Sequence, residues 1–297
     1  MLRKFRHSII YFLAISAVLL SCEKEALVPD LHNDDNEKLS IPLELTKKVL
    51  LETMEAAWCQ FSPDGDYRAA LTKNDLGEDI CEFAVYHFSD VMHLPESSWI
   101  MSKYLNSSFP CGQVDRMSPR PLNRAEWRSK ARERMEVSAK CGLAIDASEI
   151  VDNTLELNVE LAIGEEDLDE ANAGYFLQII LIEKEIDEFT KDHWQANHYN
   201  IDKSSPFFER GDPMKDYIHP NTVVKVLNGH FGLAVHSSDL KSRTSKAFNF
   251  SVDLSDQDED LRIIVMLYKN NVNNGVPYAS ETLNCQFVDI GEEQPFD

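Results

Sequence analysis

The apolar positions follow two different patterns on either side of residue 140. Before it, the runs 49–51 and 80–88 are apolar at almost every position. Such short runs are typical of strands buried on both faces. The segments 63–75 and 95–105 follow these runs, and each begins with a proline, which favours the first turn of a helix. The order strand, helix, strand, helix predicts a parallel sheet.

The following segment predicts a third strand and a longer helix. Residues 109–116 are typical of a turn that leads into a strand. Asn123 and Glu126 have the spacing of a capping box. An amphipathic helix ending near Lys140 is predicted by apolar residues at four-residue spacing, namely Trp127, Ala131, Met135 and Ala139.

After Cys141 the apolar positions alternate with polar ones. Residues 155–163 and 248–254 show this period of two, which predicts half-buried strands. The denser runs 176–182 and 261–268 predict central strands, and Asn273-Asn274-Gly275 predicts a hairpin turn. The acidic residues 165–170 predict a loop. We therefore expect an antiparallel β-sandwich over residues 141–297.

The first residues form a secretory signal. Arg3, Lys4 and Arg6 precede an apolar stretch over 9–20, which is too short to span a bilayer. Leu19-Leu20-Ser21-Cys22 resembles a bacterial lipobox, whose cysteine carries the lipid. We expect a signal peptide at 1–21, a lipid on Cys22 and a flexible acidic tether at 22–45. The alternative is an ordinary signal peptide with an unmodified cysteine.

The net charge of the chain limits the classes of partner that it can bind. The formal net charge of −22 becomes −25 when the three positive charges of the signal are removed. This acidity opposes nucleic-acid binding, so we expect no nucleic-acid partner. Glu23-Lys24-Glu25 resembles the acidic signal that directs Bacteroidetes lipoproteins to the outer face of the membrane. The alternative is that these residues are only part of a solvated tether. We expect a lipid-anchored protein of the outer membrane, on its periplasmic or cell-surface face.

Six cysteines are present, and lipid on Cys22 would leave five. The envelope permits disulfides, and an odd number leaves at least one thiol outside any internal bond. The sequence leaves the pairing open among Cys59, Cys81, Cys111, Cys141 and Cys285.

The segment Trp58-Cys59-Gln60-Phe61-Ser62-Pro63 resembles the redox corner of a thioredoxin-like domain. In that corner a second cysteine normally follows the first by three positions. Here Ser62 stands at that position, so the internal disulfide of a dithiol oxidoreductase cannot form.

Several motifs in order resemble the twenty-eight-kilodalton outer-membrane protein family of Bacteroidetes lipoproteins. They are Val49–Met54 leading to Trp58-Cys59, Tyr86-His87, Phe109-Pro110, Val114-Asp115-Arg116, Tyr217–Val224 and Ile263–Tyr268. The resemblance implies an α/β plus all-β chain, with a thioredoxin-like domain at 46–140 and an antiparallel, Ig-like β-sandwich at 141–297. It also implies surface exposure with an adhesion or receptor-like role. The chain departs from the family at Ser62 and at Asp115, where the family has cysteine and asparagine.

Three interpretations of Cys59 follow from the resemblance, which places it at a helix N-terminus facing a cis-proline, Pro110. Cys59 could be a monothiol nucleophile, which Ser62 could assist but not resolve. It could pair with Cys111, beside Pro110. It could also be vestigial on a binding platform, which is the interpretation we favour because no resolving cysteine occupies the usual position.

Other chemistry finds little support in the sequence. There is no zinc-protease motif, complete EF-hand loop or glycine-rich phosphate loop, so we expect no metal and no cofactor. Our prediction is a lipid-anchored surface protein that binds a protein or another surface ligand and is not an enzyme. The alternative is a monothiol thiol–disulfide exchange protein acting on envelope proteins through Cys59.

Overall fold

The fold consists mostly of β-strands with few helices, as an α/β unit joined to a β-rich unit requires. The structure is a computed structural model, and it describes residues 41–106, 108–168, 173–257, 260–271 and 280–297. The expected signal peptide, the expected lipid site Cys22 and the hairpin turn expected at 273–275 lie outside the described residues.

A parallel β-α-β unit begins the fold. β1 (Val49–Glu55) pairs in parallel with β2 (Cys81–His87), and α1 (Ser62–Leu76) connects them. β3 (Cys111–Val114) lies antiparallel to β1 on its other side, and β4 (Leu122–Asn123) pairs with β3. The apolar runs and Pro63 predicted β1, β2 and α1 to within a few residues, and β3 lies within the strand expected at 109–116, whereas β4 was not predicted.

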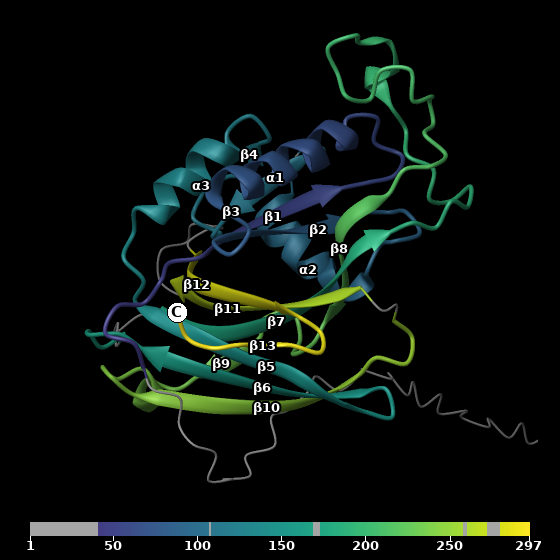
Figure 1. Cartoon of the computed structure of the whole chain (residues 1–297). Helices are drawn as coiled ribbons and strands as arrows, with labels where there is room; N and C mark the ends of the chain where they lie inside the picture. The colour runs from purple at the N-terminus through teal and green to yellow at the C-terminus, as the bar shows by residue number, and fades with distance from the viewer. Residues whose placement is uncertain (1–40, 107, 169–172, 258–259, 272–279) are drawn as a thin grey trace, which may run out of the picture.

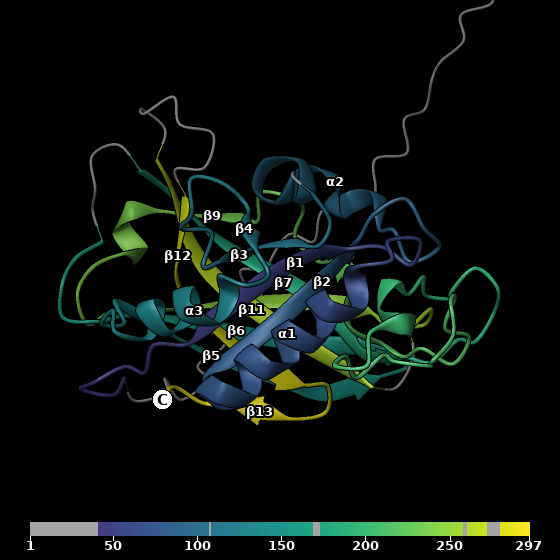
Figure 2. The ribbon, with the colours of Figure 1, turned by 90° about the horizontal axis from the view of Figure 1, so that it is seen from above.

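Helices cover both faces of this unit. α1 and α3 (Trp127–Met135) lie together over one face, as Figure 2 shows from above. Because successive strand residues point to opposite faces, β1 and β2 divide their side chains between two cores. The core under α1 and α3 contains Val49, Leu51, Phe83, Val85, Trp127 and Ala131. The opposite core contains Leu50, Met54, Ala84, Tyr86, Tyr104 and Leu105.

Two predicted helices differ from the observed elements. The segment expected to be one helix over 95–105 consists of η1 (Pro95–Ser97), α2 (Ser98–Ile100) and a π-helical turn, η2 (Met101–Leu105). The helix expected to reach Lys140 ends at Met135, because residues 136–138 are exposed and have no apolar face to bury. Asn123 belongs to β4, but its backbone N–H does donate to Glu126 Oε2 at 3.0 Å.

The β-rich half forms two sheets that pack face to face, the middle and lower layers of Figure 1. In the middle layer the strands lie in the order β12 (Ser280–Asp289), β11 (Leu261–Asn271), β7 (Ala173–Ile186) and β8 (His219–Val226), with β9 (Leu233–Val235) beside β7. The lower layer contains β10 (Ser245–Asp253), β6 (Thr154–Ile163), β5 (Cys141–Val151) and β13 (Glu293–Gln294). Short 3-10 turns occur at η3 (His198–Ile201) and η4 (Ser237–Asp239).

The two kinds of apolar pattern have a structural cause. The alternating segments are β6 and β10, whose apolar side chains fill the core between the sheets. The dense runs are β7 and β11, which are covered on both sides. Leu177, Ile179 and Leu181 face the sandwich core, whereas Ile180 and Ile182 face the core that contains Tyr104.

One sheet connects the two halves. β8 pairs with β7 and also lies parallel to β2, through Val85 and Thr222, so the order runs from β12 to β4 without a break. The sheet thus crosses residue 140, and the division of the chain there stays a prediction. Within the expected tether, Leu45 lies against Gly142 of β5.

Candidate functional site

Cys59 lies in the turn between β1 and α1. Its N–H donates to Ala56 O at 2.9 Å, and Ser62 N donates to Cys59 O at 3.1 Å, which fixes a tight corner. Pro63 occupies the first turn of α1, where its missing N–H is not needed. Only 6% of Cys59 is exposed.

The Phe109–Pro110 peptide bond is cis, and this loop faces the corner. A Cβ added to Gly65 in α1 would lie 2.8 Å from Pro110 Cβ, and the Trp58 and Phe109 rings are 5.2 Å apart. The structure therefore brings together Cys59, Pro110 and the first turns of α1.

Ser62 is buried, and its Oγ accepts a hydrogen bond from Ala56 N at 3.2 Å. The hydroxyl therefore supports the backbone of the corner. Because Ser62 carries oxygen in place of sulfur, it cannot form a disulfide with Cys59.

Cys111 follows Pro110 but faces other surroundings. Its thiol donates to Leu105 O at 2.9 Å, within the core that contains Tyr104. The five described cysteines are all buried and form no disulfide with one another. A Cys59–Cys111 bond is accordingly not present in this structure.

A long segment from the second half holds the corner in place. We call residues 187–218, between β7 and β8, the strap; it is the green loop at the upper right of Figure 1. Ala196 N donates to Ala57 O at 2.8 Å, and His198 N donates to Gln60 O at 2.9 Å. The Gln195 side chain adds a bond from Nε2 to Cys59 O at 2.9 Å.

Aromatic contacts extend this attachment along α1. The Phe61 ring lies 4.6 Å from the His198 ring and 6.3 Å from that of Tyr199. Tyr199 also accepts a hydrogen bond on its hydroxyl from Arg124 at 3.0 Å. The strap could not be predicted from the sequence, where it shows only as aromatic residues without regular spacing in a polar segment.

Two carboxyl groups lie buried beside Cys59. Glu55 ends β1 and Asp66 lies in α1, and neither is more than 6% exposed. Burial raises the pKa of Asp66 to about 7, although a hydrogen bond from Tyr217 opposes the shift. Burial, and then repulsion by Asp66, raise the pKa of Glu55 well above its usual value. Neither Glu55 nor Asp66 was predicted as a site residue from the sequence.

Histidines form a second buried group behind these carboxyls. His87 Nδ1 lies 2.9 Å from Asp90 Oδ2, and His219 Nε2 lies 2.8 Å from His193 O. Burial lowers the pKa of His219 to about 4, so its imidazole is neutral. In the part of the chain that the structure describes, no three His, Cys, Asp or Glu side chains are arranged to hold a metal ion.

The outer side of the corner carries apolar side chains that face solvent. Trp58, Phe88 and Val91 are 53%, 42% and 54% exposed. Phe109 lies between two of them, 5.2 Å from the Trp58 ring and 5.6 Å from the Phe88 ring. We call Trp58, Phe88, Val91 and Phe109 the corner platform. The indole N–H of Trp58 donates to Phe88 O at 3.1 Å, which fixes its orientation.

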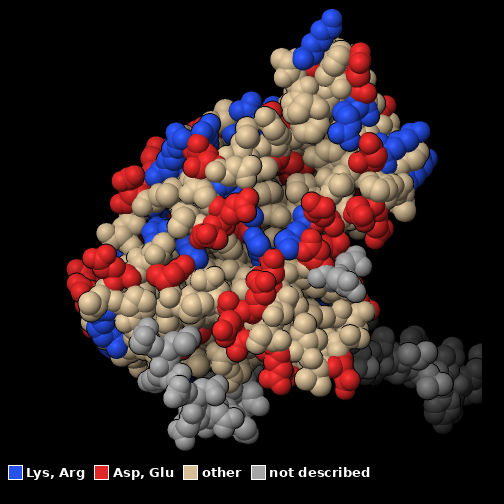
Figure 3. Space-filling view, viewed as in Figure 1, with Lys and Arg blue, Asp and Glu red and all other residues tan. Residues whose placement is uncertain are grey.

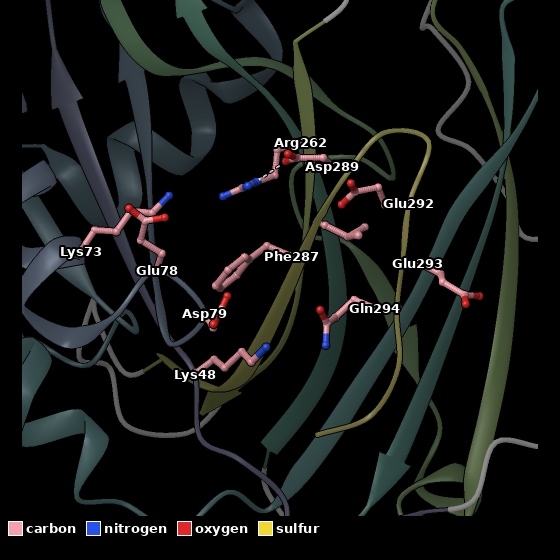
Figure 4. Close-up of a pocket in the computed structure, with 11 residues that line it drawn as sticks. Lys48, Lys73, Glu78, Asp79, Arg262, Phe287, Asp289, Glu292, Glu293 and Gln294 are labelled. Atoms are coloured by element: carbon pink, nitrogen blue, oxygen red, sulfur yellow. Dashed lines mark hydrogen bonds and ion pairs between the residues drawn. The ribbon is translucent and has the colours of Figure 1, made fainter.

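A polar cavity of about 230 Å³ lies elsewhere, beside Lys48 at the start of β1 (Figure 4). Its three cations are already paired. Lys48 pairs with Asp297 at 2.6 Å, Lys73 with Glu82 at 2.9 Å, and Arg262 with Asp289 at 2.6 Å. Because it lies at the opposite end of β1 from Cys59, this cavity is separate from the corner.

The surface seen in Figure 3 carries acidic and basic groups interspersed, with acidic ones in excess over the chain. On the face that Figure 3 shows, the basic side chains do not gather into a patch for a polyanion. Among the described residues, no helix has the length and apolar character needed to cross a membrane.

Comparison with known proteins gives one informative likeness. No family model matches the chain, and no curated protein does. Among solved structures, HBP35 of Porphyromonas gingivalis matches with a TM-score of 0.65 at 14% identity. The match covers 86% of this chain and 78% of that one, a span that neither half could supply alone. The chain therefore shares its fold, including both halves, with a protein of a Bacteroidetes bacterium.

Proposed function

We propose that this chain is a lipid-anchored protein of the bacterial outer membrane that binds a protein partner through the corner platform. Its first half is a thioredoxin-like unit that lacks dithiol chemistry, and its second half is an Ig-like β-sandwich. It belongs to the twenty-eight-kilodalton lipoprotein family and takes part in adhesion or reception at the cell surface. The HBP35 likeness supports the fold and a Bacteroidetes origin for this proposal.

The thioredoxin-like assignment is supported by the order of the elements. β1 and β2 are parallel, β3 is antiparallel to β1, β4 is antiparallel to β3, and helices cover both faces. The cysteine follows β1, and a cis-proline faces it. The Ig-like assignment is supported by two sheets packed face to face, although one of them continues into the first half.

One observation carries the binding function. The strap holds the backbone around Cys59 while that residue is 6% exposed, and the neighbouring Trp58 is 53% exposed. Thiol exchange needs an accessible sulfur, whereas protein recognition uses exposed aromatic anchors. The corner thus exposes apolar rings to a partner, whereas the Cys59 thiol stays buried.

A photoreactive phenylalanine analogue at position 91 of the anchored protein tests this function in cells. We expect a discrete covalent adduct that Trp58→Ala abolishes and Cys59→Ser leaves intact. The same analogue at Ile201, which is 84% exposed on the strap, is the matched control. No adduct at position 91, or an equal adduct at 201, would contradict the proposal.

Monothiol exchange is a second candidate, because Cys59 forms no disulfide with the other described cysteines and precedes the N-terminus of α1 by three residues. The Cys59 thiolate would attack a disulfide, form a mixed disulfide and release one thiol, and an external thiol would then resolve it. Incubation with oxidised glutathione should in that case add one glutathione at Cys59. Mass spectrometry that finds no adduct on the native protein would exclude this candidate.

The lipid anchor is tested separately. Cys22→Ala should move the protein from the membrane fraction to the soluble fraction, because a lipid chain would be its only membrane attachment. Retention of the variant in the membrane fraction would contradict lipid anchoring through Cys22.

A further inference from the structure

Glu55 and Asp66 approach each other in the space between β1 and α1. A Cβ added to Gly65, the neighbour of Asp66, would lie 2.3 Å from Glu55 Oε1. Among the described residues, neither Glu55 oxygen has a hydrogen-bond partner, and Asp66 Oδ1 has none either. A glycine in the first turn of α1 is therefore needed to make room for the carboxyl group of Glu55.

Such a pair does not carry two negative charges easily. Burial removes the water that stabilises each carboxylate, and the second charge repels the first. Both effects raise the pKa of Glu55, while burial alone raises that of Asp66 to about 7. Both shifts favour the protonated form of the pair near neutral pH.

The strap ends on this pair. Tyr217, two residues before β8, donates its hydroxyl to Asp66 Oδ2 at 2.7 Å. Its ring lies 5.0 Å from the His219 ring and 6.3 Å from that of Phe207, so it is fixed from both sides. Tyr217 closes Asp66 off from solvent, and the same strap holds Cys59 O through Gln195.

We propose that Glu55 and Asp66 share a buried proton whose loss to solvent loosens the strap from the Cys59 corner. Once both carboxyls are ionised, the fold can relieve their repulsion by admitting water to Asp66. Because Tyr217 excludes that water, relief requires the strap to lift. Lifting breaks the bonds from Ala196, His198 and Gln195 and exposes Cys59. This inference goes beyond the proposed partner binding and does not depend on it.

The charged groups around the pair do not offset a second negative charge. Arg124 lowers the pKa of Glu55 but is already paired with Asp64. His87 lowers the pKa of Asp66 but pairs with Asp90, and His219 behind it is neutral. The Ser62 hydroxyl lowers the pKa of Glu55 by more than Arg124 does, but it carries no charge. Cys59 raises the pKa of Glu55, and Arg210 lowers that of Tyr217.

Hydrogen exchange of the full mature chain between pH 6 and 9 tests the proposal. The informative amides are Ala196 and His198, which donate to the corner. Their protection factors, which are corrected for intrinsic exchange, should fall by up to about tenfold per pH unit above pH ~7, the limit for one linked proton. The internal controls are the amides of Gln195 and Met214, which bond to each other's carbonyls within the strap and should not change.

Asp66→Asn keeps an acceptor for Tyr217 but removes the charge, so the protection of Ala196 and His198 should become independent of pH. Glu55→Gln should have the same effect and is a second test if Asp66→Asn does not fold. Glu160→Gln, a buried carboxyl of β6, should behave as wild type. A wild-type protein with constant protection, or a loss of protection that persists in either variant of the pair, would overturn the proposal.

Discussion

Arg116 donates from Nε and Nη2 to the two carboxylate oxygens of Glu52, at 2.7 and 2.6 Å, and neither side chain reaches solvent. The guanidinium also lies 4.6 Å from the Tyr104 ring centroid and 4.8 Å from that of Tyr268. Tyr268 belongs to β11 and Glu52 to β1, so Arg116 connects the two halves of the chain through its contact with the Tyr268 ring.

Arg116→Lys should therefore lower the free energy of unfolding by roughly 1–3 kcal/mol, because a single ammonium cannot reproduce both bonds to Glu52, although Tyr86 still donates to Glu52 Oε1 at 3.0 Å. Urea denaturation measures the loss. The double variant Glu52→Leu/Arg116→Met should lose less than Arg116→Lys, since it leaves no buried charge. Arg120→Ala, which breaks the exposed Arg120–Glu126 pair, is the control and should cost under ~1 kcal/mol. Equal losses of unfolding free energy in Arg116→Lys and Arg120→Ala would contradict a larger contribution from the buried pair.

Gly65→Ala should destabilise the protein, although alanine is favoured over glycine by ~1 kcal/mol in an ordinary helix. Its Cβ would lie 2.3 Å from Glu55 Oε1 and 2.8 Å from Pro110 Cβ, so the neighbours must move. We expect a loss of about 1–3 kcal/mol, typical of overpacking, in the urea unfolding free energy. Leu71→Ala, at a 40% exposed position of the same helix, is the control and should change little. A stabilised Gly65→Ala variant would refute the close packing of this site.

The stability of the protein should fall as the pH rises from about 4 to 7. The pKa of Asp66 is about 7 in the folded state and ~3.9 in the unfolded chain, so the unfolded chain loses its proton first. The stabilisation from protonated Asp66 is complete below pH ~3.9 and is lost as the pH passes about 7. At ~1.4 kcal/mol per pH unit, the total is on the order of 4 kcal/mol.

Urea midpoints at successive pH values measure this dependence, and Asp66→Asn should flatten it over the same interval. Asp64→Asn, at a partly buried, arginine-paired position of the same turn, is the comparison. The assignment of this pH dependence to Asp66 would be disproved by a wild-type urea midpoint that rises between pH 4 and 7 together with an Asp66→Asn midpoint that changes in parallel.

Ser62→Cys should restore an internal disulfide with Cys59. The bond from Ser62 N to Cys59 O folds the corner back on itself, so the two Cβ atoms are expected within the reach of a disulfide. After mild oxidation, thiol counting by mass spectrometry should show the variant with two fewer thiols than its reduced form. Wild type should show no change, and Ser97→Cys, another buried serine, serves as the control. Failure of the variant to oxidise would count against the corner geometry.

Local patterns predicted much of the fold. The run 49–51 became β1, Pro63 marked the first turn of α1, and the alternation over 155–163 became β6. These elements could be predicted because each depends on which faces of its own residues are buried. The helix expected over 95–105 was less accurate, since its proline marks a start but nothing local marks the breaks that follow.

The surroundings of Cys59 could be predicted only in part. Cys59, Ser62 and Pro110 lie close in the sequence to recognisable motifs. Glu55, in contrast, looks in the sequence like a charged residue at the solvated end of a strand, and only tertiary packing shows that it is buried. The strap meets the corner through contacts such as Gln195 to Cys59, which are 136 residues apart and leave no periodic pattern.

That separation along the chain has a consequence for the export that we propose. A chain that crosses a membrane from its N-terminus presents Cys59 well before residues 187–218 follow. Until they arrive, the thiol would have no cover, and the proposed export would place it in a compartment that favours disulfide formation. The time between the arrival of the corner and the arrival of the strap is therefore the interval in which this cysteine is most open to oxidation.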